Sequence, residues 1–262
     1  MKTRIPLVVR SMSRAALLVC LVLLPPALHA GQSGCIEGNC VKGSGTFIYL
    51  DGSKYIGEFR DGKADGKGRL YYANGSFYSG DFARGKKNGQ GRYISPDGRS
   101  YEGGFKDDKL NGTGTFRYGN GMEYRGEFRD DKWNGYGELT MDGGRKYEGQ
   151  FRDGKRNGTG RFTWENGQVY EGGYADDRME GTGTLSFPDG SKYEGDFRDN
   201  CYNGTGKFTY PDGKSYAGRF KDGYADGKGI VTYKDGRTEE VEYVRGEPVK
   251  KPEMEGKKDQ PL

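Results

Sequence analysis

The sequence contains little of what catalytic and metal sites are usually built from. Its single histidine, His29, lies within residues 1–30. It has neither a Gly-x-Ser-x-Gly elbow for a nucleophile nor a Gly-x-x-x-x-Gly-Lys-Ser/Thr loop for phosphate. We therefore predict that the chain is not an enzyme, with no catalytic residue, no metal ligand, no cofactor and no small-molecule substrate.

Large apolar residues are also scarce, since Leu, Ile, Val and Phe together make up about 16% of the chain. Taken alone, this content is typical of disorder. The aromatic residues argue against disorder, because most of them fall at four fixed positions of a repeated pattern. A disordered chain has no reason to keep such a phase. We therefore predict an ordered protein whose core consists of aromatic rings and glycine.

The repeated pattern is Tyr-x-Gly-x-Phe, followed by a Gly-x-Gly pair. It restarts every 23 residues without insertion or deletion, at Tyr55, Tyr78, Tyr101, Tyr124, Tyr147, Tyr170, Tyr193 and Tyr216. A fixed period of this size indicates a linear array of small units in which each unit packs on its neighbours.

Residues 1–30 have the composition of a targeting segment. They hold four basic residues and no acidic residue, and the apolar run Ala15–Leu24 precedes a small residue, Ala30. This order is typical of a secretory signal peptide, so we predict a secreted or periplasmic protein cleaved near Ala30. The alternative is an uncleaved N-terminal membrane anchor, although about ten apolar residues are few for a bilayer.

Cleavage would change both the charge and the cysteine content of the chain. It leaves 38 basic and 38 acidic residues, so no nucleic-acid partner is predicted for a formally neutral protein. Cys35, Cys40 and Cys201 remain. In an oxidising compartment we expect a disulfide between Cys35 and Cys40, with Cys201 unpaired. Three free thiols are the alternative.

Each repeat has the pattern of a β-hairpin. In Tyr55–Phe59, apolar and polar residues alternate as in a strand with one buried face, and Gly68–Tyr72 alternates in the same way. Asp61-Gly62-Lys63 interrupts the two strands, and Asn74-Gly75 predicts a two-residue hairpin turn. The fold class expected is all-β: an elongated single-sheet antiparallel meander of 23-residue hairpins, twisted into a trough.

The strand glycines need a physical explanation, because glycine is normally unfavourable within strands. We expect them to leave flat space where a ring from a neighbouring hairpin lies against bare backbone. A single sheet would still leave aromatic surface uncovered, and such surface is typical of binding sites. The predicted partner-binding trough consists of Tyr55, Phe59, Tyr78, Phe82, Tyr101, Phe105, Tyr124 and Phe128.

At both ends the repeat continues in altered form. Residues 32–54 keep the phase but lack the Tyr and Phe, so they are predicted to be a degenerate N-terminal capping repeat. Residues 55–238 hold eight repeats, and residues 239–247 are predicted to be a C-terminal half-repeat cap. Pro248 is expected to end strand pairing, and residues 248–262 to form a disordered charged tail.

A row of basic residues recurs eight positions after the first six repeat tyrosines. Its members are Lys63, Lys86, Lys109, Lys132, Lys155 and Arg178. Equivalent residues of successive hairpins lie two strands apart, at about 9.5 Å, so the row would form a stripe along one edge of the sheet. It has two interpretations: a strip for an anionic ligand such as a lipid head group, or a solvated edge in which neighbouring aspartates alternate with the cations.

The pattern Tyr55-Ile56-Gly57-Glu58-Phe59, continued by Gly66-Lys67-Gly68 and Asn74-Gly75, resembles the MORN (membrane occupation and recognition nexus) repeat. The resemblance extends over residues 32–246. It implies an elongated antiparallel meander with a scaffold or attachment role. It further implies protein–protein assembly, often as dimers, or binding to phosphoinositides and other acidic lipids.

These observations lead to one functional hypothesis and two alternatives. We expect a non-enzymatic exported scaffold that binds a protein partner, or a second copy of itself, through the aromatic and glycine trough. The first alternative is peripheral attachment to acidic membrane lipid through the basic row. The second is a structural spacer in the cell envelope.

Overall fold

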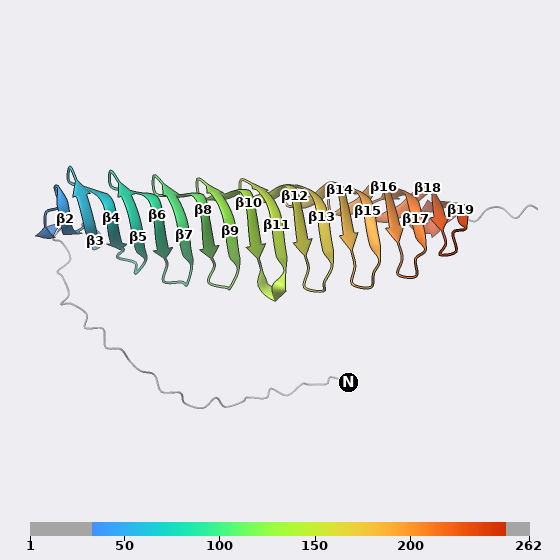
Figure 1. Ribbon diagram of the computed structural model, residues 1–262, viewed down its shortest axis with the longest axis horizontal. Helices are drawn as coiled ribbons and strands as arrows, with labels where there is room; N and C mark the ends of the chain where they lie inside the picture. The colour runs from blue at the N-terminus through green and yellow to red at the C-terminus, as the bar shows by residue number, and fades with distance from the viewer. Residues whose placement is uncertain (1–32, 250–262) are drawn as a thin grey trace, which may run out of the picture.

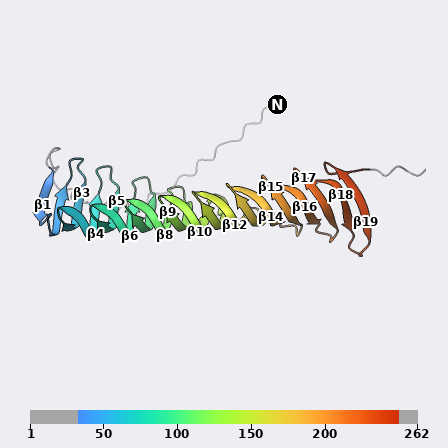
Figure 2. The same cartoon turned by 90° about the horizontal axis from the view of Figure 1, so that it is seen from above.

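The computed structural model describes residues 33–249, which form one antiparallel β-sheet of 20 strands. Figure 1 shows the strands side by side along a rod, with turns on both long edges, and Figure 2 shows the rod from above. Each strand pairs with the next strand in the chain. The predicted all-β single-sheet meander is confirmed. The predicted signal peptide and most of the predicted tail lie outside the described residues.

Short and long strands alternate along the rod. The strands are β1 (Gly34–Gly38), β2 (Gly43–Ile48), β3 (Lys54–Arg60), β4 (Lys63–Tyr71), β5 (Phe77–Ala83), β6 (Lys86–Ile94), β7 (Ser100–Lys106), β8 (Lys109–Arg117), β9 (Glu123–Arg129), β10 (Lys132–Thr140), β11 (Lys146–Arg152), β12 (Lys155–Thr163), β13 (Val169–Ala175), β14 (Arg178–Ser186), β15 (Lys192–Arg198), β16 (Cys201–Thr209), β17 (Ser215–Lys221), β18 (Tyr224–Thr232), β19 (Thr238–Val244) and β20 (Glu247–Pro248). A 3-10 turn, η1 (Asp142–Gly144), lies between β10 and β11.

The two edges of the sheet differ in turn type, and here one sequence prediction is wrong. The two-residue turn lies at Asp61-Gly62, where φ is +50° and +72°, and it pairs Arg60 directly with Lys63. Asn74-Gly75 instead belongs to a longer loop closed by the Tyr72 amide, which donates to the Ser76 carbonyl at 2.9 Å. Both dipeptides favour positive φ, so the dipeptide alone does not set the loop length.

Each long strand contains a bulge. The bulge interrupts the alternation of apolar and polar residues, so this alternation did not reveal the full length of the strand. In the first complete hairpin Gly57 pairs with Gly68, but Phe59 pairs with Ala64, so β4 carries two more residues than β3 in this interval. Gly66 lies in the bulge with φ of +104°, a conformation that glycine adopts without steric cost. The equivalent irregularity recurs in the hairpins that follow. Bulges of this kind bend the sheet.

The bend places the repeat tyrosines inside the rod. The ring of Tyr55 is fully buried and lies over glycines of its own hairpin, because a Cβ at Gly57 would lie 2.6 Å from the Tyr55 Oη. A Cβ at Gly68 would overlap the same ring. The expectation that rings rest on bare backbone is therefore confirmed, but the ring and the backbone belong to one hairpin and not to two neighbours.

Successive hairpins are joined by edge-to-face ring contacts. Tyr55 contacts Phe59 of its own hairpin at 5.1 Å between ring centroids and Phe82 of the next hairpin at 5.0 Å. The same arrangement continues to Tyr216 and Tyr243 near the C-terminal end, at 5.2 Å. Edge-to-face geometry is the favourable one for aromatic pairs, so the aromatic rings form a continuous core along the rod.

The two ends of the array differ from its middle. In the first hairpin, Cys35 and Cys40 form the predicted disulfide, while Cys201 is exposed and unpaired within the described residues. At the other end the prediction for Pro248 is wrong: this residue pairs with Tyr243 in β20, and the Val249 amide donates to the Glu242 carbonyl at 2.8 Å. An outer strand tolerates proline because one side of it needs no partner.

Candidate functional site

The predicted aromatic trough is a core and not a binding surface. Its eight residues are Tyr55, Phe59, Tyr78, Phe82, Tyr101, Phe105, Tyr124 and Phe128, and their exposed fractions range from 0% to 6%. Side chains from beyond the bulge cover the rings. The indole of Trp133 lies on the face of Tyr124, with 4.7 Å between centroids and 14° between planes. A partner therefore has no access to these rings, and the prediction that they bind it is wrong.

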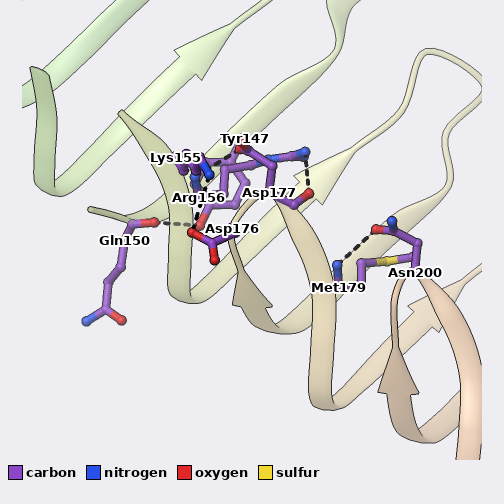
Figure 3. Close-up of polar contacts among 8 residues, drawn as sticks. All are labelled: Tyr147, Gln150, Lys155, Arg156, Asp176, Asp177, Met179 and Asn200. Carbon is purple, nitrogen blue, oxygen red and sulfur yellow. Dashed lines mark hydrogen bonds and ion pairs between the residues drawn. The ribbon is translucent and has the colours of Figure 1, made fainter. Parts of the chain in front are cut away.

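Hydrogen bonds hold the buried tyrosine hydroxyls in place. The Tyr101 hydroxyl donates to the Gly104 carbonyl at 3.0 Å, and the Tyr147 hydroxyl donates to the Gln150 carbonyl in the same way at 3.0 Å (Figure 3). Burial raises the pKa of Tyr101 to about 12. These hydroxyls consequently stay protonated at neutral pH and serve the fold as donors.

The basic row lies at the edge with the two-residue turns, and its charge is largely balanced. Each of five cations faces an aspartate of the next repeat: Lys86 and Asp107 at 3.5 Å, Lys109 and Asp130 at 3.6 Å, Lys132 and Asp153 at 3.9 Å, Lys155 and Asp176 at 3.6 Å, and Arg178 and Asp199 at 3.1 Å. Lys63 differs, because Arg84 occupies the corresponding position of the next repeat. Such exposed pairs contribute little stability, about 0–1 kcal/mol each.

Contacts between turns also link neighbouring repeats at this edge. Figure 3 shows Asp177 beside Arg156 of the preceding repeat and Asn200 beside Met179. The Asp177 amide donates to the Arg156 carbonyl at 3.0 Å, and the Asp177 carboxylate accepts from the Arg156 amide at 3.0 Å. Asn200 accepts from the Met179 amide at 2.9 Å. These hydrogen bonds at the edge with the two-residue turns thus hold neighbouring repeats together.

The face of the sheet opposite the buried tyrosine rings carries a feature that was not predicted from the sequence. Directly paired glycines run along the rod, from Gly57 opposite Gly68 to Gly218 opposite Gly229, and we name them the glycine row. The residues before and after each glycine point outward, because side chains alternate across a strand. The backbone between them forms the floor of a shallow channel.

Over β3–β9 this channel becomes a groove of about 1130 Å³. Its glycines are Gly68, Gly80, Gly91, Gly103, Gly114 and Gly126. One wall consists of paired outward residues, which we name the outer row: Ile56, Arg69, Ser79, Arg92, Glu102, Thr115 and Arg125. Lys67, Gln90 and Thr113 stand on the other side of the glycines. The outward positions of the repeat could have revealed this wall in the sequence.

The charges of the groove are unequal. Five basic side chains and one acidic side chain line it. Lys67 is paired with Asp81 at 2.6 Å, and Arg125 with Glu123 at 3.3 Å. Arg69 and Arg92 are both exposed, and within residues 33–249 neither takes part in an ion pair. The groove therefore presents two guanidinium groups that form no ion pair within residues 33–249, and one of them, Arg92, stands directly opposite Glu102 in the strand register.

Comparison with protein families agrees with this architecture. The model of the MORN repeat matches residues 55–77, 78–98, 101–123, 124–145, 147–169, 170–192, 193–215 and 216–236. The chain belongs to the MORN repeat family. Each match covers one hairpin with its aromatic pair and its glycines, so the resemblance expected from the sequence is confirmed.

Solved structures offer a weaker comparison with this MORN array. It is similar to the CPAP G-box domain, with 19% identity, a TM-score of 0.39 and coverage of 76% of this chain and 97% of that one. It is also similar to the TCP domain of SAS-4 from Drosophila melanogaster, solved with a proline-rich motif of Ana2, with 14% identity, a TM-score of 0.28 and coverage of 83% and 95%. TM-scores this low carry no conclusion about function. No curated protein sequence matches the chain.

Within residues 33–249, the structure has no helix with the length and apolar character that crossing a bilayer requires.

Proposed function

We propose that this MORN array is a non-enzymatic exported scaffold that binds a protein partner through its outward sheet face. The observation that carries the proposal is the groove along β3–β9, which is long, open and lined by polar side chains above a glycine floor. The buried rings serve to keep the face rigid. Rigid, preformed surfaces lose little entropy on binding.

Export is part of the proposal. The basic and apolar segment at residues 1–30 supports it, as does the disulfide between Cys35 and Cys40, because disulfides persist mainly in oxidising compartments. Mass spectrometry of the N-terminus in cell fractions tests this part. We expect a chain that starts near Gly31 in the exported fraction; an intact N-terminus in the cytosol would contradict it.

Partner binding is tested by site-specific photo-crosslinking in the native compartment. A benzophenone amino acid is placed at Thr115, in the groove wall, or at Thr184 on β14, the equivalent outward position of a later repeat. Both threonines are half-buried. We expect a discrete protein adduct from position 115 and none from position 184. Equal products from both positions, or none from either, would overturn the proposal.

Attachment to acidic lipid through the basic row receives less support from the geometry. Five of its six cations face an aspartate of the next repeat, so the edge offers alternating charge and no continuous cationic strip. Co-sedimentation with anionic vesicles tests this alternative, since replacement of the row by serine must abolish binding if the row is the site. A spacer role requires neither vesicle binding nor an adduct at position 115.

A further inference from the structure

The groove over β3–β9 is narrow enough to select the shape of its occupant. On each strand, the two wall residues are the ones directly before and directly after a floor glycine. Their Cα atoms therefore lie about 6.6 Å apart. An α-helix with side chains is about 10–12 Å wide, and a lipid bilayer is broad and flat. An extended backbone takes only about 4.8 Å between neighbouring strands, so it is the narrowest of these occupants. The six strand spacings from β3 to β9 give about 29 Å, the length of about nine extended residues.

Backbone pairing does not provide recognition in this groove. The occupant crosses the strands, and the amides and carbonyls of the floor are already used in strand pairing on both sides. Side chains of the walls must therefore make the specific contacts. Arg69 and Arg92 stand two strands apart in the outer row, at about 9.6 Å, which corresponds to about three residues of an extended chain.

The sign of the charge changes along the rod. Beyond Arg125 the outer row continues with Glu138, Glu148, Arg161, Glu171, Thr184, Glu194, Lys207, Ala217, Ile230 and Glu240. A second hollow at the C-terminal end, of about 790 Å³, is lined by Glu239, Glu240 and Glu242 against one lysine, Lys228. The outer row is thus net positive over β3–β9 and net negative beyond it, which favours an acidic ligand over β3–β9.

We propose that the groove over β3–β9 binds an extended acidic segment of the partner protein, with its carboxylates on Arg69 and Arg92. The inference rests on the proposed function and specifies the partner. Guanidinium groups suit this role because they pair with carboxylates in a two-pronged geometry. Within residues 33–249 neither arginine forms an ion pair, so a bound carboxylate contacts them without first breaking one; Arg69 has no acidic residue opposite it in the register, whereas Arg92 has Glu102.

The test measures fluorescence anisotropy with the processed full-length chain. The probes are a fluorescein-labelled peptide of about ten residues with glutamate at every third position and serine elsewhere, and a peptide with glutamine in place of each glutamate. We expect the acidic peptide to bind at least about tenfold more tightly, with affinity that falls as salt rises. Equal binding of the two peptides would overturn the inference.

Matched variants locate the binding. The double substitution Arg69→Ser and Arg92→Ser should lower the affinity for the acidic peptide about tenfold or more. Lys207→Ser, in the same outer row but outside the groove, should leave that affinity unchanged. All three side chains are exposed, so folding is not at risk. An undiminished affinity of the double variant, or an equal loss with Lys207→Ser, contradicts the proposal.

Two further outcomes separate this inference from its alternatives. If phosphatidylserine vesicles bind through Arg69 and Arg92 and exclude the peptide, the ligand is a lipid head group and the inference fails. If the acidic peptide does not bind but the adduct at Thr115 persists, the groove binds a partner by other chemistry. Loss of that adduct as well would remove the proposed function itself.

Discussion

Replacing Gly137 by alanine tests the packing argument most directly. This glycine lies in β10 beneath the ring of Tyr124. A Cβ added there would lie 2.5 Å from the Tyr124 Oη and 2.7 Å from the ring carbons Cε2 and Cζ. Ordinary contact begins near 3.4 Å, so the ring must move by almost one ångström to admit a single methyl group.

The surroundings of the ring resist that movement. Trp133 is stacked on one face at 4.7 Å, and Phe128 and Phe151 meet it edge-on at 5.0 and 5.2 Å. The Tyr124 hydroxyl also donates to the Glu127 carbonyl at 2.9 Å. Overpacking costs about 1–3 kcal/mol, and loss of the hydrogen bond about 1 kcal/mol. Relief of glycine entropy returns about 0.5–1 kcal/mol, which leaves a net destabilisation of about 2 kcal/mol.

Urea unfolding followed by tryptophan fluorescence measures this change, because Trp133 lies on the affected ring. The matched control is a double-mutant cycle with Tyr124→Leu, which removes the ring that the new methyl group would strike. In that background Gly137→Ala should become neutral or stabilising by up to about 1 kcal/mol. Additive effects of the two substitutions would refute the packing argument.

Three further predictions concern other parts of the array. Gly126→Val should lower the unfolding free energy by more than about 2 kcal/mol, because a Cβ there meets a backbone Cα at 2.6 Å. Lys132→Ala removes one exposed ion pair and should lower it by less than about 1 kcal/mol. Equal urea midpoints for the two variants would contradict this prediction. Burial raises the pKa of Tyr101 to about 12, against about 10 in an unfolded chain. The unfolded state therefore loses this proton first, so stability that is complete below pH 10 should fall between pH 10 and about 12; melting temperatures that stay constant over that range would be inconsistent with buried hydroxyls. Reduction of the disulfide in the first hairpin should speed amide exchange within residues 34–48 and leave the middle repeats protected, and a uniform loss of protection would show that the bond supports more than this hairpin.

The repeat period itself could be read from the sequence because its signal is local. Each Tyr-x-Gly-x-Phe segment alternates as a strand, and identical spacing places identical units side by side. The single meander, the family and the disulfide of the first hairpin followed from that spacing and from the positions of Cys35 and Cys40. None of these depends on knowing how the sheet curves.

The position of the accessible face depended on that curvature. The sequence shows that Tyr55 and Phe59 share one face of a strand. The sequence pattern is the same whether that face is exposed or buried. The bulge at Gly66 decides between the two, because two extra residues on one strand bend the sheet and bring side chains from beyond the bulge over the rings. A bulge is defined by how two strands pair. The alternation of residues within one strand does not show that pairing.

The chain alone thus determined a rod of ring-bearing hairpins, since periodicity and turn residues act over a few positions. Only the tertiary structure decided which side of the rod is accessible. The tyrosines lie in the interior, Lys155 pairs with an aspartate of the following hairpin, and within residues 33–249 Arg69 and Arg92 form no ion pair above the glycine floor. The physical reason is that exposure and ion pairing are set between strands, where residues from different repeats meet.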